Sequence, residues 1–204
     1  MKRHSAIIGT ILAVILAGAV LARPAAAFSF PVLDVALGQS LGVDGAPNDG
    51  GLSAEFSPLW RVGERSHFGL TTFADDIGTG TLDLVDHSSG TDLGTVTEHH
   101  RMTYGLAWRA DHDVLQRRRW AVGVSGLAGW WRIQDDVRGA SAGAASAVGY
   151  AIGLDIRNAM TSRHEFGIAT RWQALTSDRH SSFRRVDHYA TAALEWRWTT
   201  DGRH

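Results

Sequence analysis

The sequence predicts an all-β fold, an eight-stranded antiparallel up-and-down transmembrane β-barrel. Three observations predict it. Side chains alternate between apolar and polar with a period of two, the gaps between the alternating segments are long and short in turn, and the tryptophans gather near the segment ends. Beyond the N-terminal segment, no stretch is apolar for the roughly 18 residues that a spanning helix needs, so the alternating segments decide the fold.

The first residues have the organisation of a secretory signal peptide. Lys2 precedes an apolar stretch from Ala6 to Leu21, and the small residues Ala25 to Ala27 follow it. A transmembrane anchor needs about 20 apolar residues, more than this stretch supplies, so cleavage is favoured over anchoring. We therefore predict a cleaved signal peptide at 1–27, Sec-type export and a single outer-membrane barrel domain at 28–204.

Composition excludes several classes of function. Without the signal peptide the chain carries 17 Arg against 21 acidic residues, a formal charge of −4, which does not favour a nucleic-acid partner. The sequence contains no Cys, so disulfides, thiolate metal sites and cysteine nucleophiles are excluded. Its histidines show no spacing that fixes a coordination geometry, and we expect no metal and no cofactor.

Alternation with a period of two marks eight segments. In the last of them Ala190, Leu194 and Trp196 share one face, while Glu195 and Arg197 share the other. One face of each segment is therefore mostly apolar, and the other carries the charged residues. The predicted strands are 32–41, 52–61, 67–75, 101–109, 119–131, 148–157, 165–173 and 188–198.

The gaps between these segments indicate the topology. Longer gaps rich in Gly, Ser, Asp and Thr alternate with shorter ones, as the outer loops and periplasmic turns of an outer-membrane barrel do. The predicted extracellular loops are 43–51, 76–100, 132–145 and 175–185, and the predicted periplasmic turns are 62–66, 110–118 and 158–163. With an even number of strands, both chain ends lie on the periplasmic side.

The polar face fits the narrow interior of an eight-stranded barrel, because it combines charged residues with Gly, Ala, Ser and Thr. We predict a polar network in the lumen formed by Asp34, Glu55, Arg109, Asp155, Arg171, Glu195 and Arg197. The rival architecture is a soluble periplasmic ligand-binding barrel, whose apolar face would point inward. Its surface would carry Lys and fewer small residues than the polar face has here.

The tryptophans indicate a membrane barrel independently, since aromatic residues gather where a barrel wall meets the lipid head groups. We predict an aromatic girdle formed by Trp60, Trp108, Trp120, Trp130, Trp172, Trp196 and Trp198. In the predicted topology Trp130 and Trp172 lie near the outer rim, and the other five lie near the periplasmic rim. Trp131 is out of phase with this pattern and predicts a β-bulge.

In this pattern the chain resembles the small outer-membrane barrels of the OmpA transmembrane-domain and OmpX type. The resemblance covers residues 28 to 198. It implies a lumen filled by acids and arginines, and a final strand whose last aromatic residue is read by the outer-membrane assembly machinery. Trp198 is the residue that matches this signal, although 199–204 follow it here.

The function predicted first is a structural or surface-interaction role without an open pore. The expected partners are outer-membrane lipids and lipopolysaccharide, the assembly machinery, and an extracellular ligand that contacts the loops, chiefly 76–100; we expect a monomer. The alternative is a lipid A modifying hydrolase. It rests on His180, Ser182 and Asp187, which resemble the lipid A 3-O-deacylase arrangement of an H-x-S pair followed by an acid. Phe183 replaces the Asn of that family, and an exposed polar loop is the competing interpretation.

Overall fold

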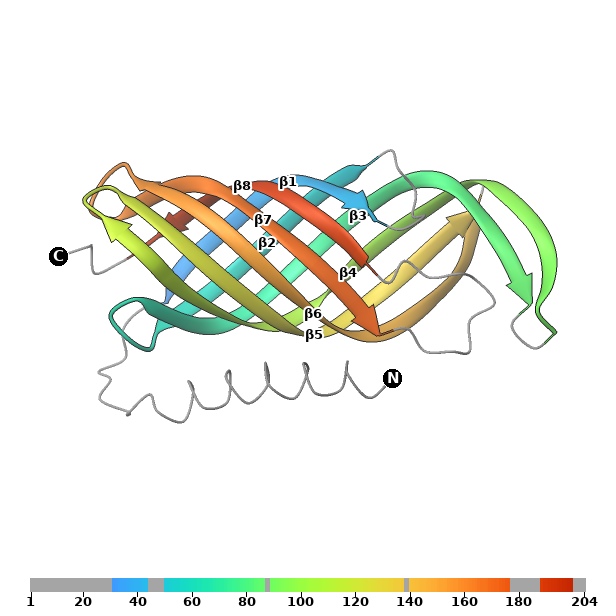
Figure 1. Cartoon of the computed structure of the whole chain (residues 1–204), viewed down its shortest axis with the longest axis horizontal. Coiled ribbons are helices and arrows are strands. Elements are labelled where there is room, and N and C mark those ends of the chain that lie inside the picture. The colour runs from blue at the N-terminus through green and yellow to red at the C-terminus, as the bar shows by residue number, and fades with distance from the viewer. Residues whose placement is uncertain (1–30, 44–49, 87–88, 138–139, 177–187, 200–204) are drawn as a thin grey trace.

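The computed structural model describes residues 31–43, 50–86, 89–137, 140–176 and 188–199. They form eight strands: β1 (Val32–Gly42), β2 (Gly51–Arg61), β3 (Ser66–Asp86), β4 (Thr91–Arg117), β5 (Trp120–Val137), β6 (Ala140–Ala159), β7 (His164–Thr176) and β8 (His188–Trp198). Each strand pairs antiparallel with the next and β8 pairs with β1, so the sheet closes into an up-and-down barrel (Figure 1). The predicted fold class is confirmed. Among the described residues no helix has the length and hydropathy to cross a membrane.

The register of the barrel is strongly staggered. From Val32 the paired residues lead once around all eight strands and return to β1 at Gly42, ten residues beyond the start. The residues on this path are Leu59, Gly69, Arg109, Leu127, Ala151, Gln173 and Tyr189. A stagger of this size makes the strands cross the wall obliquely, as Figure 1 shows, and it limits the interior to a width that side chains can fill.

Successive side chains point alternately into the lumen and away from it, because the strand period is two. In β5, for example, Ser125 and Leu127 are buried, whereas Val124 is 41% and Trp130 is 65% exposed. The apolar face of the sequence pattern is therefore the outer face of the barrel, and most of the charged residues on the strands point inward.

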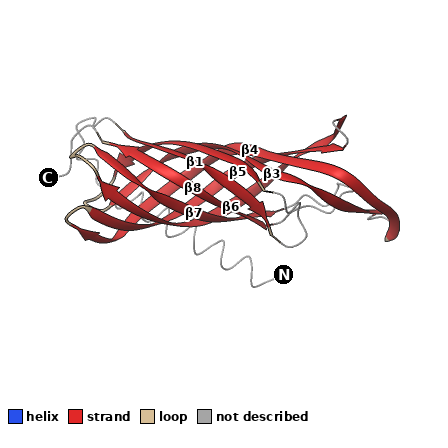
Figure 2. Ribbon diagram, turned by 90° about the horizontal axis from the view of Figure 1, so that it is seen from above, coloured by secondary structure: helices blue, strands red, loops and turns tan. Residues whose placement is uncertain are grey.

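The β3–β4 and β5–β6 hairpins extend beyond the neighbouring strands; β5 and β6 pair as far as Val137 and Ala140, whereas the pairing of β6 with β7 ends at Val148. β3 and β4 pair with each other as far as Asp86 and Thr91, whereas the pairing of β2 with β3 ends at Asp75. The β3–β4 hairpin curves away past the rim in Figure 1, and the view in Figure 2 shows the same projection. We call this the long-hairpin end. The opposite end, where 62–65, 118–119 and 160–163 connect the strands, is the short-turn end.

The predicted long loops at 76–100 and 132–145 are wrong, because most of both segments is β-strand. Both segments have the Gly, Asp and Thr content that is typical of loops, but their backbones pair as β-hairpins. Register shifts interrupt the β3–β4 ladder, and Gly78 and Gly94 adopt φ values of 94° and 97°. Glycine reaches this region without steric cost, so the irregular strands stay paired.

The predicted turn at 110–118 is also mostly wrong. β4 continues to Arg117, and the connection to β5 consists of Arg118 and Arg119 alone. Arg118 has a φ of 42°, the left-handed conformation that tight hairpin turns require.

The β-bulge predicted at Trp131 is not found. Trp130 pairs with Val148 and Trp131 pairs with Ala147, so the register runs unbroken through both tryptophans. Trp131 points into the lumen and is 1% exposed. It is an apolar side chain on the inner face, which the assumption of a wholly polar lumen did not anticipate.

Candidate functional site: the barrel lumen

Arg109 on β4 is the centre of the largest ion network in the lumen. Its guanidinium is fully buried and donates hydrogen bonds to four carboxylates. The donor–acceptor distances are 2.6 Å to Glu55 Oε1, 2.7 Å to Asp111 Oδ1, 3.0 Å to Asp34 Oδ2 and 3.2 Å to Glu195 Oε1. These acids come from β2, β4, β1 and β8, so one side chain links distant parts of the wall.

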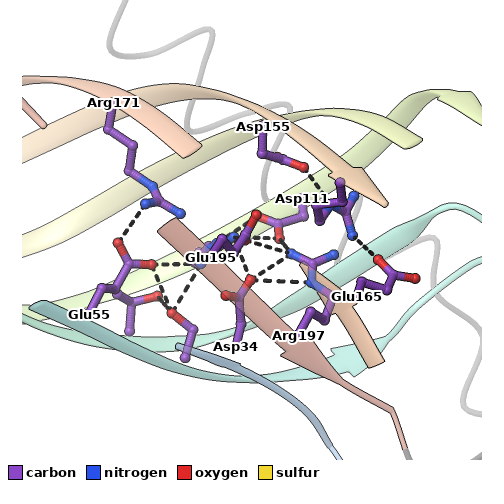
Figure 3. A network of polar contacts seen from close by, with 12 residues as sticks. Asp34, Glu55, Asp111, Asp155, Glu165, Arg171, Glu195 and Arg197 are labelled. Atoms are coloured by element: carbon purple, nitrogen blue, oxygen red, sulfur yellow. Dashed lines mark hydrogen bonds and ion pairs between the residues drawn. The ribbon is translucent and has the colours of Figure 1, made fainter. Parts of the chain in front are cut away.

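Two further arginines extend this network. Arg197 on β8 donates to Asp34 Oδ2 at 2.7 Å and to Asp111 Oδ2 at 2.6 Å, so two guanidinium groups share both acids. Arg171 on β7 contacts Glu55 Oε2 at 2.8 Å. Figure 3 shows these side chains converging in the barrel interior. A buried charge is costly unless it is paired, and here each guanidinium has at least one carboxylate partner.

A second ion cluster surrounds Arg157 on β6, nearer the short-turn end. Its guanidinium donates to Asp155 at 2.5 Å and to Glu165 at 3.1 Å, and it also pairs with Asp113. All four side chains are almost fully buried. This cluster fills the lumen where β6 and β7 approach the turn 160–163.

Tyr189 on β8 belongs to a hydrogen-bonded group that lies on the long-hairpin side of Arg109. Its hydroxyl lies 2.8 Å from Asp75 Oδ2, 2.7 Å from Gln173 Oε1 and 3.1 Å from the indole nitrogen of Trp131. The Trp131 nitrogen also donates to Gln173 Oε1 at 3.0 Å. The buried hydroxyl, amide and indole therefore all have partners.

Apolar side chains fill the lumen at the level of Tyr189. The rings of Phe73 and Trp131 lie 4.9 Å apart, and both are buried. The apolar cluster around them comprises Ile77, Ala107, Leu127, Ile133, Ala147, Ala151, Leu175 and Tyr189. Beyond it, Arg101 pairs with Asp135 at 2.5 Å and 3.0 Å toward the long-hairpin end. The described lumen is thus layered: ion clusters, then an apolar and aromatic layer, then one further ion pair.

Comparison with known proteins bears on this fold. No protein-family model matches the chain, and no curated protein matches it. Solved structures do. The chain is similar to Neisserial surface protein A (NspA), with a TM-score of 0.58, 11% identity, and coverage of 83% of this chain and 96% of that one. It is also similar to Ail of Yersinia pestis in complex with the heparin analogue sucrose octasulfate, with a TM-score of 0.50, 6% identity, and coverage of 83% and 97%.

The fold is that of the small outer-membrane β-barrels. The resemblance expected from the alternation pattern is confirmed at the level of architecture. At identities of 11% and 6% the similarity concerns the fold alone.

The structure places all seven predicted network residues on the inner face of the barrel. Six of them meet in the network around Arg109: Asp34, Glu55, Arg109, Arg171, Glu195 and Arg197. Asp155 lies apart and pairs with Arg157 instead.

Several lumen residues were not singled out from the sequence. They are Asp75, Arg101, Asp111, Asp113 and Asp135. The predicted fourth strand ended at 109, although the alternation continues through Asp111 and Asp113, and that continuation was the available signal. Asp75 was the last residue of the predicted strand 67–75, and Arg101 was the first residue of the predicted strand 101–109. Asp135 lay in a segment read as a loop.

The seven predicted girdle tryptophans lie on the outer face. Trp60, Trp108, Trp120, Trp130 and Trp172 are between 36% and 65% exposed. Trp60, Trp120 and Trp198 stand beside strand termini at the short-turn end, and Trp196 lies two residues before Trp198. Trp108 stacks on Phe68 with ring centroids 5.4 Å apart.

The predicted catalytic candidates His180, Ser182 and Asp187 lie outside the described residues. In the part of the chain that the structure describes, no group of three His, Cys, Asp or Glu side chains could hold a metal ion. His100 lies on β4, and its Nε2 is 2.9 Å from Asp76 Oδ1.

Proposed function

We propose that this chain is an integral outer-membrane protein with a structural or surface-interaction role and without an open pore. One observation carries the proposal: the barrel has its apolar side chains outside and its charges inside. On the outer face Leu52 is 77%, Leu194 is 72% and Trp130 is 65% exposed, whereas Arg109 and Arg157 are 0% and 1% exposed. Only a surrounding of lipid makes this arrangement favourable.

A soluble ligand-binding barrel would need the reverse arrangement. Each apolar Å² left in water would cost about 25 cal/mol, and the outer wall here exposes large apolar side chains on β1, β2 and β4 to β8. The ion clusters would in addition occupy the volume that such a barrel uses for its ligand. The distribution of side chains therefore favours the membrane barrel.

The orientation follows from the two ends. Outer-membrane barrels have short turns on the periplasmic side and longer connections outside. The short-turn end therefore faces the periplasm, and the β3–β4 hairpin projects outward from the cell. β1 begins and β8 ends at the short-turn end, which fits export behind a cleaved signal peptide at 1–27 and a final strand that presents Trp198 to the assembly machinery.

The β3–β4 hairpin supports the surface-interaction role. Its outer part, Leu82 to Asp86 paired with Thr91 to Val96, lies beyond the pairing with β2 and with β5, so it stands clear of the wall as an arm. Partners outside the cell would meet this arm first. We place the interaction surface here, on a paired hairpin in place of the loop that composition predicted at 76–100.

The filled lumen supports the absence of a pore. Phe73, Trp131 and Leu175 occupy the interior at one level, and the arginine clusters occupy the levels on the short-turn side. Eight-stranded barrels have an interior just wide enough for such side chains. Water and solutes therefore have no continuous path through the layers described.

The test is a comparison of boiled and unboiled outer-membrane fractions on a denaturing gel. A closed barrel resists detergent unfolding until it is heated, so the unboiled band migrates differently from the boiled one. We expect the protein in the outer-membrane fraction with a heat-dependent shift, and no stepwise conductance after insertion into a planar bilayer. A soluble periplasmic protein without the shift would contradict the proposed location, and stable conductance steps would contradict the closed lumen.

A further inference from the structure

A groove runs over the outer wall from β5 across β6, β7 and β8 to β1. Small side chains form its floor: Thr170 on β7, and Ala190 and Ala192 on β8. Larger apolar side chains stand around them, namely Val124, Ile152, Leu154, Trp172 and Leu41. The groove has a volume of about 540 Å³, within the roughly 300–1,000 Å³ that small-molecule ligands occupy.

The register explains why the wall is hollow here. Ala190 pairs with Trp172 on one side and with Leu41 on the other, and paired residues point to the same face of the sheet. A methyl group between an indole and an isobutyl group leaves a depression. Thr170 and Ala192 continue it one step along the strands, toward the middle of the wall.

A polar amide stands beside this apolar floor. Gln39 pairs with Ala192, so its side chain lies on the same outer face, where it is exposed. No hydrogen bond of this amide is found within the described part of the chain. An amide surrounded by hydrocarbon is destabilising unless it is hydrogen-bonded, so the position calls for a partner that brings polar atoms into the lipid.

Aromatic and polar side chains lie at the end of the groove that is nearer the long-hairpin end. His188, two residues before Ala190, stacks on Trp172 with ring centroids 4.8 Å apart and an interplanar angle of 14°. Leu41 and His188 both lie within two residues of the strand ends at the long-hairpin end. The groove therefore extends from the long-hairpin end of the barrel toward the middle of the wall.

We propose that this groove binds one acyl chain of lipid A in the outer leaflet, with the Gln39 amide hydrogen-bonded to the linkage that carries the chain. The inference rests on the proposed function, which places the long-hairpin end at the cell surface. Amide-linked acyl chains occur in lipid A but not in glycerophospholipids. Such a linkage offers both a donor N–H and an acceptor carbonyl, which the Gln39 carboxamide matches with its own acceptor and donors.

The test is native mass spectrometry of the full-length, folded protein in detergent after incubation with purified lipid A or with phosphatidylethanolamine. Ala192→Leu fills the floor, Gln39→Leu removes the amide, and Ala54→Leu adds the same bulk at an exposed position on β2 as the control. We expect one lipid A per wild-type barrel, at least tenfold weaker retention for Ala192→Leu, equivalent to about 1.4 kcal/mol, weakened retention for Gln39→Leu and no change for Ala54→Leu.

Each alternative result overturns the proposal. Equal retention by Ala192→Leu and Ala54→Leu would remove the site. Phosphatidylethanolamine bound as tightly as lipid A and lost with the same variants would assign the groove to phospholipid, and a dimer broken by Ala192→Leu would assign it to a second copy of the chain. A heat-dependent gel shift in every variant separates these outcomes from a failure of the proposed function, in which the wild type itself would show no shift.

Discussion

At the scale of single residues, Arg109 holds four carboxylates from four segments of the wall within hydrogen-bonding distance. The acids lie close enough to repel one another, since Asp34 and Glu195 both contact the same guanidinium nitrogen. The network is therefore stabilised by the arginines at its centre. Removal of one guanidinium would leave several buried charges without compensation.

We therefore expect Arg109→Met to lower the free energy of unfolding by about 3–5 kcal/mol, the usual cost of breaking a buried ion pair from one side. Urea unfolding in lipid vesicles, followed by tryptophan fluorescence, measures it. Arg132→Met is the matched control, because Arg132 is exposed and its Nη1 is 3.5 Å from Ser146 Oγ. That control should shift the free energy by less than about 0.5 kcal/mol. Equal losses in the two variants would show that the network adds nothing specific.

Tyr189 supplies a second residue-scale prediction. Tyr189→Phe keeps the ring but removes the hydroxyl that lies within hydrogen-bonding distance of Asp75, Gln173 and Trp131. We expect a loss of about 1–3 kcal/mol in the same unfolding measurement, because buried polar groups lose a partner. Tyr104→Phe serves as the comparison, since Tyr104 is 41% exposed on the outer face. A loss no larger than that of Tyr104→Phe would argue against a hydrogen-bonded layer.

The inward position of the seven predicted network residues followed from the sequence, but their partners did not, and Asp111 was missed because the predicted fourth strand ended at 109. Alternation alone places Asp34 and Arg109 on the charged face. Their contact across 75 positions depends on the ten-residue stagger of the barrel, which no local pattern encodes. The same stagger brings Tyr189 beside Asp75. Trp131 was misjudged because a large aromatic residue on the charged face looked like an irregularity, whereas the lumen has an apolar layer that accepts it.

At the scale of elements, strand number and order could be predicted, but strand length could not. Composition distinguishes loops from strands through Gly, Asp, Ser and Thr, and the outer halves of β3, β4, β5 and β6 are rich in these residues. Pairing within each hairpin satisfies the backbone groups regardless of side chain, so the β3–β4 and β5–β6 ladders continue past the predicted strand ends. The sequence pattern therefore marks the part of each strand that the proposed function places against lipid.

The independence of the β3–β4 arm can be tested by shortening it. Residues 82–86 and 91–96 pair with one another and with no other strand that the structure describes, since the pairing of β4 with β5 begins at His99. We expect replacement of this segment by a two-residue Asn-Gly turn to preserve the heat-dependent gel shift and to change the free energy of unfolding by less than about 1 kcal/mol. Loss of the folded band would mean that the arm is needed for assembly of the barrel.

At the scale of the whole molecule, the two faces of one closed sheet have opposite chemistry. Stagger and strand number set an interior that side chains fill, and the alternation assigns charges to that interior and apolar groups to the outside. The same alternation would suit a soluble barrel with its faces exchanged. The central claim is therefore the direction in which the apolar face points.

Electron paramagnetic resonance on β5 tests that direction most directly. The chain has no Cys, so a nitroxide can be attached to single cysteines introduced at Val124, Ser125, Gly126, Leu127 and Ala128. In lipid vesicles we predict high collision rates with oxygen, and low rates with a water-soluble nickel complex, at 124, 126 and 128. Positions 125 and 127 should be shielded from both reagents. Oxygen contact confined to 125 and 127, or nickel contact at 124, 126 and 128, would contradict a lipid-facing apolar wall.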